Sequence, residues 1–241
     1  MIIDAAEERL FVISDLHLGN PSSTARSRLV EFLEYARLTG TSVCINGDGF
    51  EMLQTSFSRL SADAVPVLNA LRRLMREGNR VYYLVGNHDI SLEHFLEDWL
   101  FTQIAPFLNL RSGDALIRIE HGHLYDPWFV RYPKGYEMGA RVLGLALLVH
   151  PDVYSVYAKS QARSAARRKG DPPDEVAADM LLSRGFDTVI FGHTHNALDV
   201  QLENGHYVNS GNWLQGSSYV EIDQGKVELK KWISWNASDR V

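Results

Sequence analysis

Five polar clusters in the sequence contain the residue types that bind metal ions, and each follows a short apolar run. The clusters are Asp15-Leu16-His17, Gly47-Asp48-Gly49-Phe50-Glu51, Gly86-Asn87-His88-Asp89, His121-Gly122-His123 and Gly192-His193-Thr194-His195. Loops at the carboxyl ends of strands are where α/β sheets bind their ligands. We therefore expect the five clusters to converge on one crevice.

The side chains of these clusters favour one group of metals. Residues two apart in an extended segment point the same way, so Asp15 can face the same pocket as His17, and His193 the same pocket as His195. Carboxylate oxygens and imidazole nitrogens without a thiolate favour Mn²⁺, Fe²⁺ or Zn²⁺, and the histidines argue against a pure Mg²⁺ or Ca²⁺ site. We expect divalent transition ions, with Mn²⁺ ahead of Fe²⁺ and Zn²⁺.

The apolar runs before the clusters predict the strands that position them. These runs lie at residues 10–13, 43–45, 81–85, 116–119 and 188–191. They are rich in β-branched and aromatic residues, and three are nearly all apolar, as in strands covered on both faces. Turn signals at Asn204-Gly205 and Gln224-Gly225 predict hairpins that complete a second sheet. The fold class is therefore α/β.

Helical patterns lie between the first three strands, at about residues 23–38 and 62–77. The second pattern has an apolar stripe that includes Val65, ends at Gly78 and places Pro66 in its first turn, where proline is tolerated. The resulting order of elements is β-α-β-α-β.

The segment 124–184 interrupts the strand rhythm between two of the clusters. It is helical and rich in Tyr and Arg, and we expect it to form a cap inserted into a single domain that spans residues 1–241. It contains an apolar strip at residues 142–149 and the cations Arg163, Arg167 and Arg168, which we expect to bind substrate phosphate. A solvated helix face, or a patch that contacts a membrane surface, is the alternative for these arginines.

Composition limits the classes of function. The 241 residues carry a formal net charge of −6, which gives no global field for a polyanion and argues against a dedicated nucleic-acid binder. Cys44 is the single cysteine and cannot form an internal disulfide. The first residues have neither the basic start nor the apolar core of a secretory signal, so we expect a cytoplasmic protein. The oligomeric state stays open.

The series D-x-H, G-D-x-x-E, G-N-H-D, H-G-H and G-H-T-H resembles the calcineurin-like metallophosphoesterase superfamily over residues 10–213. The resemblance implies a four-layer sandwich, with two mixed β-sheets flanked by helices. It also implies two metal ions, one held by Asp15, His17 and His195 and the other by Asn87, His121 and His193, with Asp48 bridging them. In this family His88 sits beside the leaving-group oxygen, and Glu51 can orient it.

Two such metals would polarise phosphoryl oxygens and acidify a shared water, so the expected reaction is hydrolysis of a phosphodiester or pyrophosphate bond. More narrowly, the chain is similar to the UDP-2,3-diacylglucosamine pyrophosphohydrolases, which share the core, a helical insertion and a similar length. Those enzymes usually carry G-N-R-D and H-G-D where this chain has His88 and His123, and these departures favour a different substrate. A nucleotide-linked or lipid-linked pyrophosphate is the expected class.

Three other functions stay open at this point. The chain could be a scaffold that keeps the fold without catalysis, although His88 and all seven candidate ligands are present. A protein phosphatase would need an open cleft, and a nuclease would need more positive charge around the crevice. Asp89 and His123 could serve as hydrogen-bond partners of the ligands or could be only structural.

Overall fold

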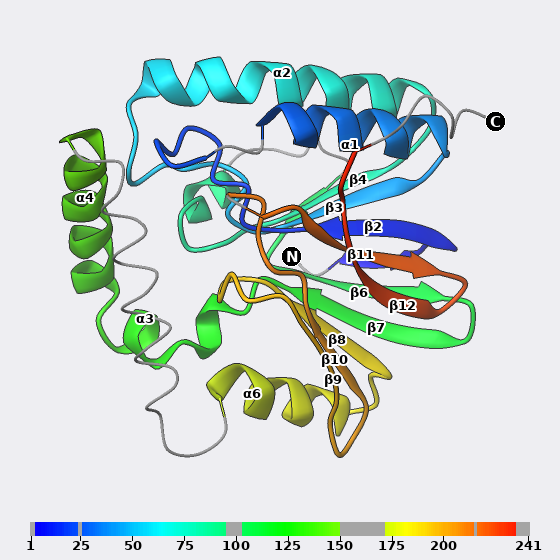
Figure 1. Ribbon diagram of the computed structural model, residues 1–241. Coiled ribbons are helices and arrows are strands. Elements are labelled where there is room, and N and C mark those ends of the chain that lie inside the picture. The colour runs from blue at the N-terminus through cyan, green and yellow to red at the C-terminus, as the bar shows by residue number, and fades with distance from the viewer. Residues whose placement is uncertain (1–2, 24–25, 95–102, 150–171, 215, 235–241) are drawn as a thin grey trace.

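The computed structural model describes residues 3–23, 26–94, 103–149, 172–214 and 216–234 (Figure 1). Two six-stranded sheets pack face to face. The first sheet has, in spatial order, β1 (Ile3–Ala6), β6 (Phe107–Ser112), β7 (Ala115–Glu120), β8 (Thr188–Phe191), β10 (His206–Asn209) and β9 (Leu198–Gln201). The second has β12 (Lys226–Lys231), β11 (Ser218–Asp223), β2 (Arg9–Ile13), β3 (Ser42–Asn46), β4 (Val81–Leu84) and β5 (Gln103–Ala105).

Both sheets are mixed. In the second sheet β2, β3, β4 and β5 are parallel, with Val12 opposite Cys44 and Ile45 opposite Tyr83, and β11 joins β2 in the antiparallel sense. In the first sheet β7, β8 and β10 are parallel and β6 pairs antiparallel with β7. The parallel strands end in the same direction within each sheet, so the loops that follow them share one edge.

The strands before the clusters are buried because layers cover both of their faces. Every residue of β3, β4 and β8 is buried. Side chains such as Val12, Cys44 and Ile119 fill the space between the two sheets. Helices α1 (Arg26–Leu38) and α2 (Phe57–Arg76) cover the outer face of the second sheet, and α6 (Pro173–Leu182) covers the first (Figure 1). The predicted four-layer sandwich is confirmed.

Helix α2 begins earlier than the sequence pattern indicated. Ser56 is its N-cap, and the Ser56 hydroxyl accepts a hydrogen bond from the Arg59 N–H. Pro66 therefore lies inside the helix, and its expected place in the first turn was wrong. The expected stripe was also wrong at Val65, which is 53% exposed, because the helix buries Ala64 and Val67 beside it.

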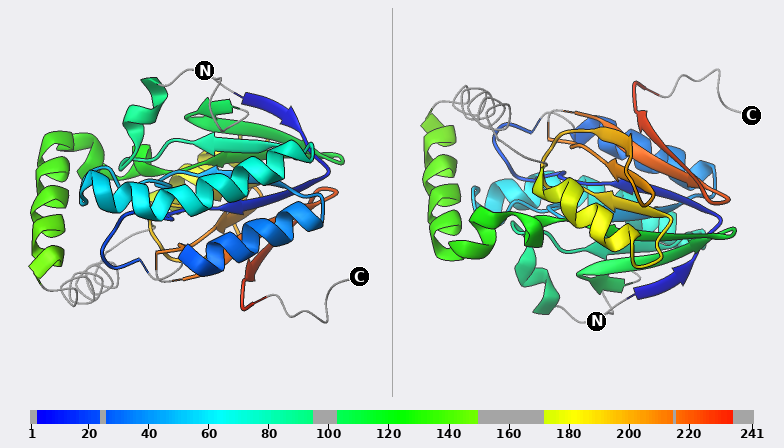
Figure 2. Two further views of the ribbon diagram at one scale, coloured as in Figure 1. Left: turned by 90° about the horizontal axis from the view of Figure 1, so that it is seen from above. Right: turned by 90° about the horizontal axis from the view of Figure 1, so that it is seen from below.

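The segment expected to form the cap contains two different structures. Helices α3 (Pro127–Arg131) and α4 (Pro133–Val149) stand at one end of the sandwich, apart from both sheets (Figure 2). Helix α6 instead packs on β8 and β10 as part of a sandwich layer, through residues such as Ala178 and Leu182. Two 3₁₀ turns, η1 (Ile90–His94) and η2 (His123–Tyr125), complete the described elements. Within these ranges, no helix has both the length and the apolar character needed to cross a membrane.

Candidate metal centre

The five clusters meet at the carboxyl-end edge of the two sheets. Within the second sheet, the Asp15 N–H donates to the Gly47 carbonyl at 3.1 Å, and within the first, the Gly192 N–H donates to the His121 carbonyl at 3.1 Å. The two sheets are joined at this edge, since the His193 N–H donates to Asp15 Oδ2 at 3.1 Å. The predicted convergence of the clusters is therefore present.

Five of the candidate ligands have an unusual backbone conformation. A positive φ is costly for residues with a side chain and is concentrated at functional sites. The values are 54° at Asp15, 43° at His17, 52° at Asp48, 63° at His193 and 59° at His195. In the described part of the chain, Gln224 in a hairpin turn is the one other non-glycine residue with a positive φ. The strain therefore lies almost entirely at the candidate centre.

The ligand atoms gather around Asp48 and Asp15. Asp48 Oδ2 lies 3.7 Å from His17 Nε2 and 3.4 Å from His121 Nε2, so this carboxylate is placed between two histidines. Asp15 Oδ1 lies 3.1 Å from His195 Nε2, and His195 Nε2 lies 3.2 Å from His17 Nε2. Three groups have ligand atoms close enough to hold one ion: Asp15–His17–His195, Asp15–Asp48–His121 and His17–Asp48–His88.

Two buried polar atoms at this place fit a metal. The Asn87 amide donates to the Tyr136 hydroxyl at 2.9 Å, and His121 Nδ1 donates to the Asn46 carbonyl at 2.8 Å. These bonds leave Asn87 Oδ1 and His121 Nε2 buried without a hydrogen-bond partner. Such orphaned atoms are costly and rare in folded proteins. Both are lone-pair donors, which a divalent ion would satisfy.

Electrostatics favour cations at the centre. Burial opposes ionisation of Asp48, but His121 and the other nearby imidazoles hold its pKa well below the usual value. His195 and His121 likewise lower the pKa of Asp15 against the effect of burial. Burial would lower the pKa of His121, but Asp48 and Asp15 raise it to about 10, so the Nε2 lone pair attracts a cation, whether a proton or a metal ion. The centre therefore holds two buried, ionised carboxylates.

His88 and Glu51 form a hydrogen-bonded pair beside the candidate ligands. His88 Nδ1 donates to Glu51 Oε1 at 2.8 Å, and both side chains are buried. The backbone N–H groups of Leu53 and Gln54 also donate to Glu51 Oε1, at 3.1 and 3.0 Å. Burial would lower the pKa of His88, but Glu51 and Asp48 raise it to about 9. His88 is thus held in place by Glu51, and the nearby carboxylates favour its protonated form.

Asp89 holds two of the loops together. Its Oδ2 accepts from the Gly49 N–H at 2.8 Å and from the Tyr83 hydroxyl, and its Oδ1 accepts from the Gly86 N–H at 2.7 Å. This joins the loop of Asp48 to the loop of Asn87. Asp89 therefore contributes to the candidate centre by fixing the backbone of these two loops.

His123 is a neutral side chain beside the ligands. It is 5% exposed and its ring meets Phe129 edge-on at 5.1 Å. Burial, with help from the charge of nearby His121, lowers the pKa of His123 to about 3. It packs α3 against the centre.

Sequence reasoning missed two side chains that reach the ligands from α3 and α4. Asp126 Oδ2 accepts from His193 Nε2 at 3.2 Å, and Tyr136 accepts from the Asn87 amide. Asp126 precedes a proline, a sequence typical of a helix N-cap, but nothing in the local sequence links it to His193. The expected phosphate-binding residues Arg163, Arg167 and Arg168 lie outside the described residues.

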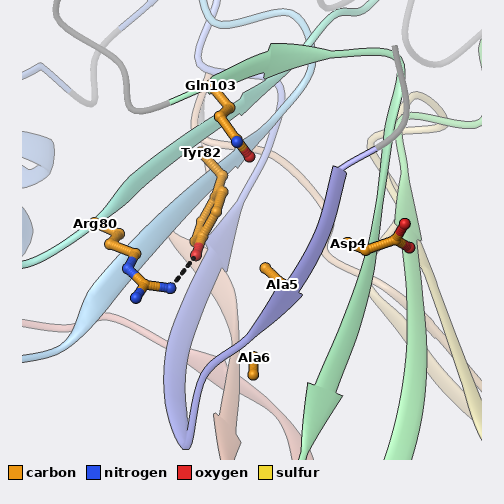
Figure 3. Close-up of a pocket in the computed structure, with 6 residues that line it drawn as sticks. All are labelled: Asp4, Ala5, Ala6, Arg80, Tyr82 and Gln103. Atoms are coloured by element: carbon orange, nitrogen blue, oxygen red, sulfur yellow. Dashed lines mark hydrogen bonds between the residues drawn. The ribbon is translucent and has the colours of Figure 1, made fainter.

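A separate pocket of about 330 Å³ lies at the outer edges of the two sheets. It is lined by Asp4, Ala5, Ala6, Arg80, Tyr82 and Gln103, and Figure 3 shows the Arg80 guanidinium donating to the Tyr82 hydroxyl. None of the candidate ligands lines this pocket, so it is not part of the metal centre.

The chain is similar in sequence to two curated hydrolases and, more distantly, to a solved structure. The UDP-2,3-diacylglucosamine hydrolase of Nitrosococcus oceani is 28% identical over 234 residues, covering 86% of this chain and 88% of that enzyme. The same hydrolase of Blochmanniella pennsylvanica is 25% identical over 200 residues, covering 77% and 78%. A solved structure of an archaeal phosphodiesterase is 15% identical and covers 92% of this chain and 99% of its own, with a TM-score of 0.49.

The model of the calcineurin-like phosphoesterase family matches residues 8–197. All five clusters lie inside this segment. The chain therefore belongs to the calcineurin-like phosphoesterase family and is a metal-dependent phosphoesterase.

Proposed function

We propose that the chain hydrolyses a phosphodiester or pyrophosphate bond at a centre that binds two divalent metal ions, with Mn²⁺ preferred over Fe²⁺ or Zn²⁺. The position of Asp48 carries this proposal. Its Oδ2 lies between His17 Nε2 and His121 Nε2, at 3.7 and 3.4 Å, as a bridging ligand would. Asp15, His17 and His195 complete one site, and Asn87, His121 and His193 the other.

Bound metals supply a Lewis acid for the phosphoryl oxygens and an acidified water as the nucleophile. The other roles in the proposed reaction fall to side chains of the protein. The Nδ1 proton of His88 is bound to Glu51, which holds the ring, and a ring nitrogen of His88 lies within 4.8 Å of ligand atoms of His17 and Asp48. We assign His88 to donate a hydrogen bond to the oxygen that leaves phosphorus, a contribution of ~10²–10⁴-fold for a positioned acid. Glu51 is then its positioning residue.

The proposed substrate class is a nucleotide-linked or lipid-linked pyrophosphate such as UDP-2,3-diacylglucosamine. Two observations support it. The curated relatives named above are hydrolases of that compound. Beside the centre, α3 and α4 expose Trp128, Val142 and Leu145, which would suit an acyl chain, a base or a peripheral contact with a membrane. We propose that residues 124–149 form the cap, and that Arg163, Arg167 and Arg168 bind the substrate phosphates.

The experiment compares three substrates with Mn²⁺ present: bis-p-nitrophenyl phosphate, UDP-2,3-diacylglucosamine and a nucleotide pyrophosphate without acyl chains. Hydrolysis in ¹⁸O-water identifies the phosphorus that is attacked. Faster turnover of the acylated substrate, with UMP as a product, supports the proposal. Turnover of the nucleotide pyrophosphate without turnover of the acylated substrate would exclude a lipid-linked substrate. Two bound ions without hydrolysis of any phosphate ester or anhydride would favour the scaffold function.

A second comparison tests the proposed arginines. Replacing Arg163, Arg167 and Arg168 together by alanine should slow hydrolysis of the two pyrophosphates and leave the rate for bis-p-nitrophenyl phosphate unchanged. Equal rates on every substrate would reduce these arginines to a solvated surface.

A further inference from the structure

We propose that Asp126 and Tyr136, two residues of the cap, position His193 and Asn87, so that the metal site of Asn87, His121 and His193 forms fully only when α3 and α4 are docked. This inference rests on the proposed two-metal function. It separates the two sites: the sandwich alone builds one of them, and the other depends on the cap.

Asp126 joins the start of a cap helix to a candidate ligand. Its Oδ1 accepts from the Trp128 N–H at 2.8 Å as the N-cap of α3, and its Oδ2 accepts from His193 Nε2 at 3.2 Å. A histidine that binds a metal generally donates its other ring N–H to such an outer acceptor, which fixes the ring and its tautomer. The bond to Asp126 leaves His193 Nδ1 as the nitrogen with a lone pair.

Tyr136 selects the orientation of the Asn87 amide. Its hydroxyl accepts from Asn87 Nδ2 at 2.9 Å, which leaves the amide oxygen as the buried atom without a partner. An amide turned the other way would present an N–H₂ group to the cation instead of an oxygen lone pair. Tyr136 also packs edge-on against Phe129 of α3 at 5.4 Å, so the two cap helices hold the phenol together.

Two candidate ligands of the other site have outer partners in the sandwich loops. His17 Nδ1 donates to Glu51 Oε2 at 3.1 Å, and Asp15 Oδ2 accepts from the His193 backbone N–H. His121, which belongs to the cap-dependent site, is itself fixed by the Asn46 carbonyl. Among the described contacts, the cap thus reaches the side chains of two candidate ligands, Asn87 and His193, and both belong by resemblance to the same site.

The test measures Mn²⁺ binding to the full chain by calorimetry, for wild type and for Asp126→Asn and Tyr136→Phe. Asparagine is also a good N-cap, so Asp126→Asn keeps the start of α3 and weakens only the acceptor for His193. We expect wild type to bind two ions. Each variant should keep one ion at wild-type affinity and bind the other ~10–100-fold more weakly, the usual cost of losing an outer partner. Asp126→Glu should restore part of the loss.

Arg141→Ala is the matched control, because Arg141 lies on α4, is exposed and pairs with Glu137 away from the centre. It should bind both ions as wild type does. The Co²⁺ absorption spectrum gives a second readout, which should change for one of two ions in Asp126→Asn and Tyr136→Phe. The inference would be overturned if both variants bound two ions with wild-type affinity, or if the affinity for both ions fell equally. A wild-type chain that binds only one ion would instead contradict the two-metal function.

Discussion

His17 and His88 share one carboxylate, since His88 Nδ1 donates to Glu51 Oε1 at 2.8 Å and His17 Nδ1 donates to Glu51 Oε2 at 3.1 Å. Their rings meet edge-on with centroids 4.8 Å apart. One is a candidate ligand and the other a candidate acid. Glu51 therefore fixes both parts of the proposed chemistry relative to each other.

Glu51→Gln should damage metal binding and catalysis together, because an amide cannot accept strongly from both imidazoles. We expect Mn²⁺ affinity and kcat each to fall by ~10–100-fold, as for the loss of an outer acceptor. Calorimetry and steady-state kinetics on a small diester measure the two effects. Unchanged metal affinity would show that the bond to His17 has no role in ligation.

Asp48→Asn and His88→Asn should produce different defects. Asp48 contacts histidines of both sites, so its loss should remove metal and activity together. His88→Asn should retain the metals and lower kcat by ~10²–10⁴-fold, the range for a positioned acid. Metal content after gel filtration, measured beside the rate, separates them. A His88→Asn protein without metal would make His88 a ligand.

Gly86→Ala should disable the centre without any change of a ligand. A Cβ at this position would fall well inside van der Waals distance of Asp48 Oδ1, with the backbone of Asp48 also close. We expect loss of Mn²⁺ binding and a lower melting temperature. Gly139→Ala in α4 is the control, because its Cβ would meet nothing within 4 Å, and helix propensity should stabilise it by ~0.5–1 kcal/mol. Normal metal binding by Gly86→Ala would contradict the observed packing.

Stability should fall at alkaline pH because buried tyrosines resist ionisation. Burial raises the pKa of Tyr219 to about 12, above its value of about 10 in an unfolded chain. The folded state then holds the proton more tightly, so the stability from Tyr219 is present below about pH 10 and is lost as pH rises toward about 12. Urea midpoints at about pH 9 and about pH 11 measure this loss, and Tyr219→Phe should reduce it. An equal fall of the urea midpoint between the two pH values in wild type and Tyr219→Phe would assign the effect to other tyrosines.

The sequence was sufficient for elements whose signal is local. Buried parallel strands such as β3 and β8 appear as short apolar runs, because both of their faces are covered. The first turn of α2 lacked such a signal, since Phe57 is 85% exposed and no apolar stripe marks where the helix begins. Pro66 suggests a helix start in this sequence, but the helix continues through it.

The parts of the site that could not be predicted depend on tertiary placement. Asp126 contacts His193, 67 positions later, and Tyr136 contacts Asn87, 49 positions earlier. These contacts are set by how α3 and α4 dock on the sandwich, which periodicity does not encode. The ligand clusters were different, because each follows its own strand and the shared edge of parallel strands brings them together.

The centre also has a consequence for the order of folding. His17 and His195 are 178 positions apart, and their clusters follow strands of different sheets. A chain with only one sheet formed can offer an ion only part of either ligand set. High-affinity metal uptake should therefore come late, after the sheets have packed together. We predict that Mn²⁺ slows unfolding far more than it speeds refolding, because the complete ligand sets exist only once both sheets have packed together.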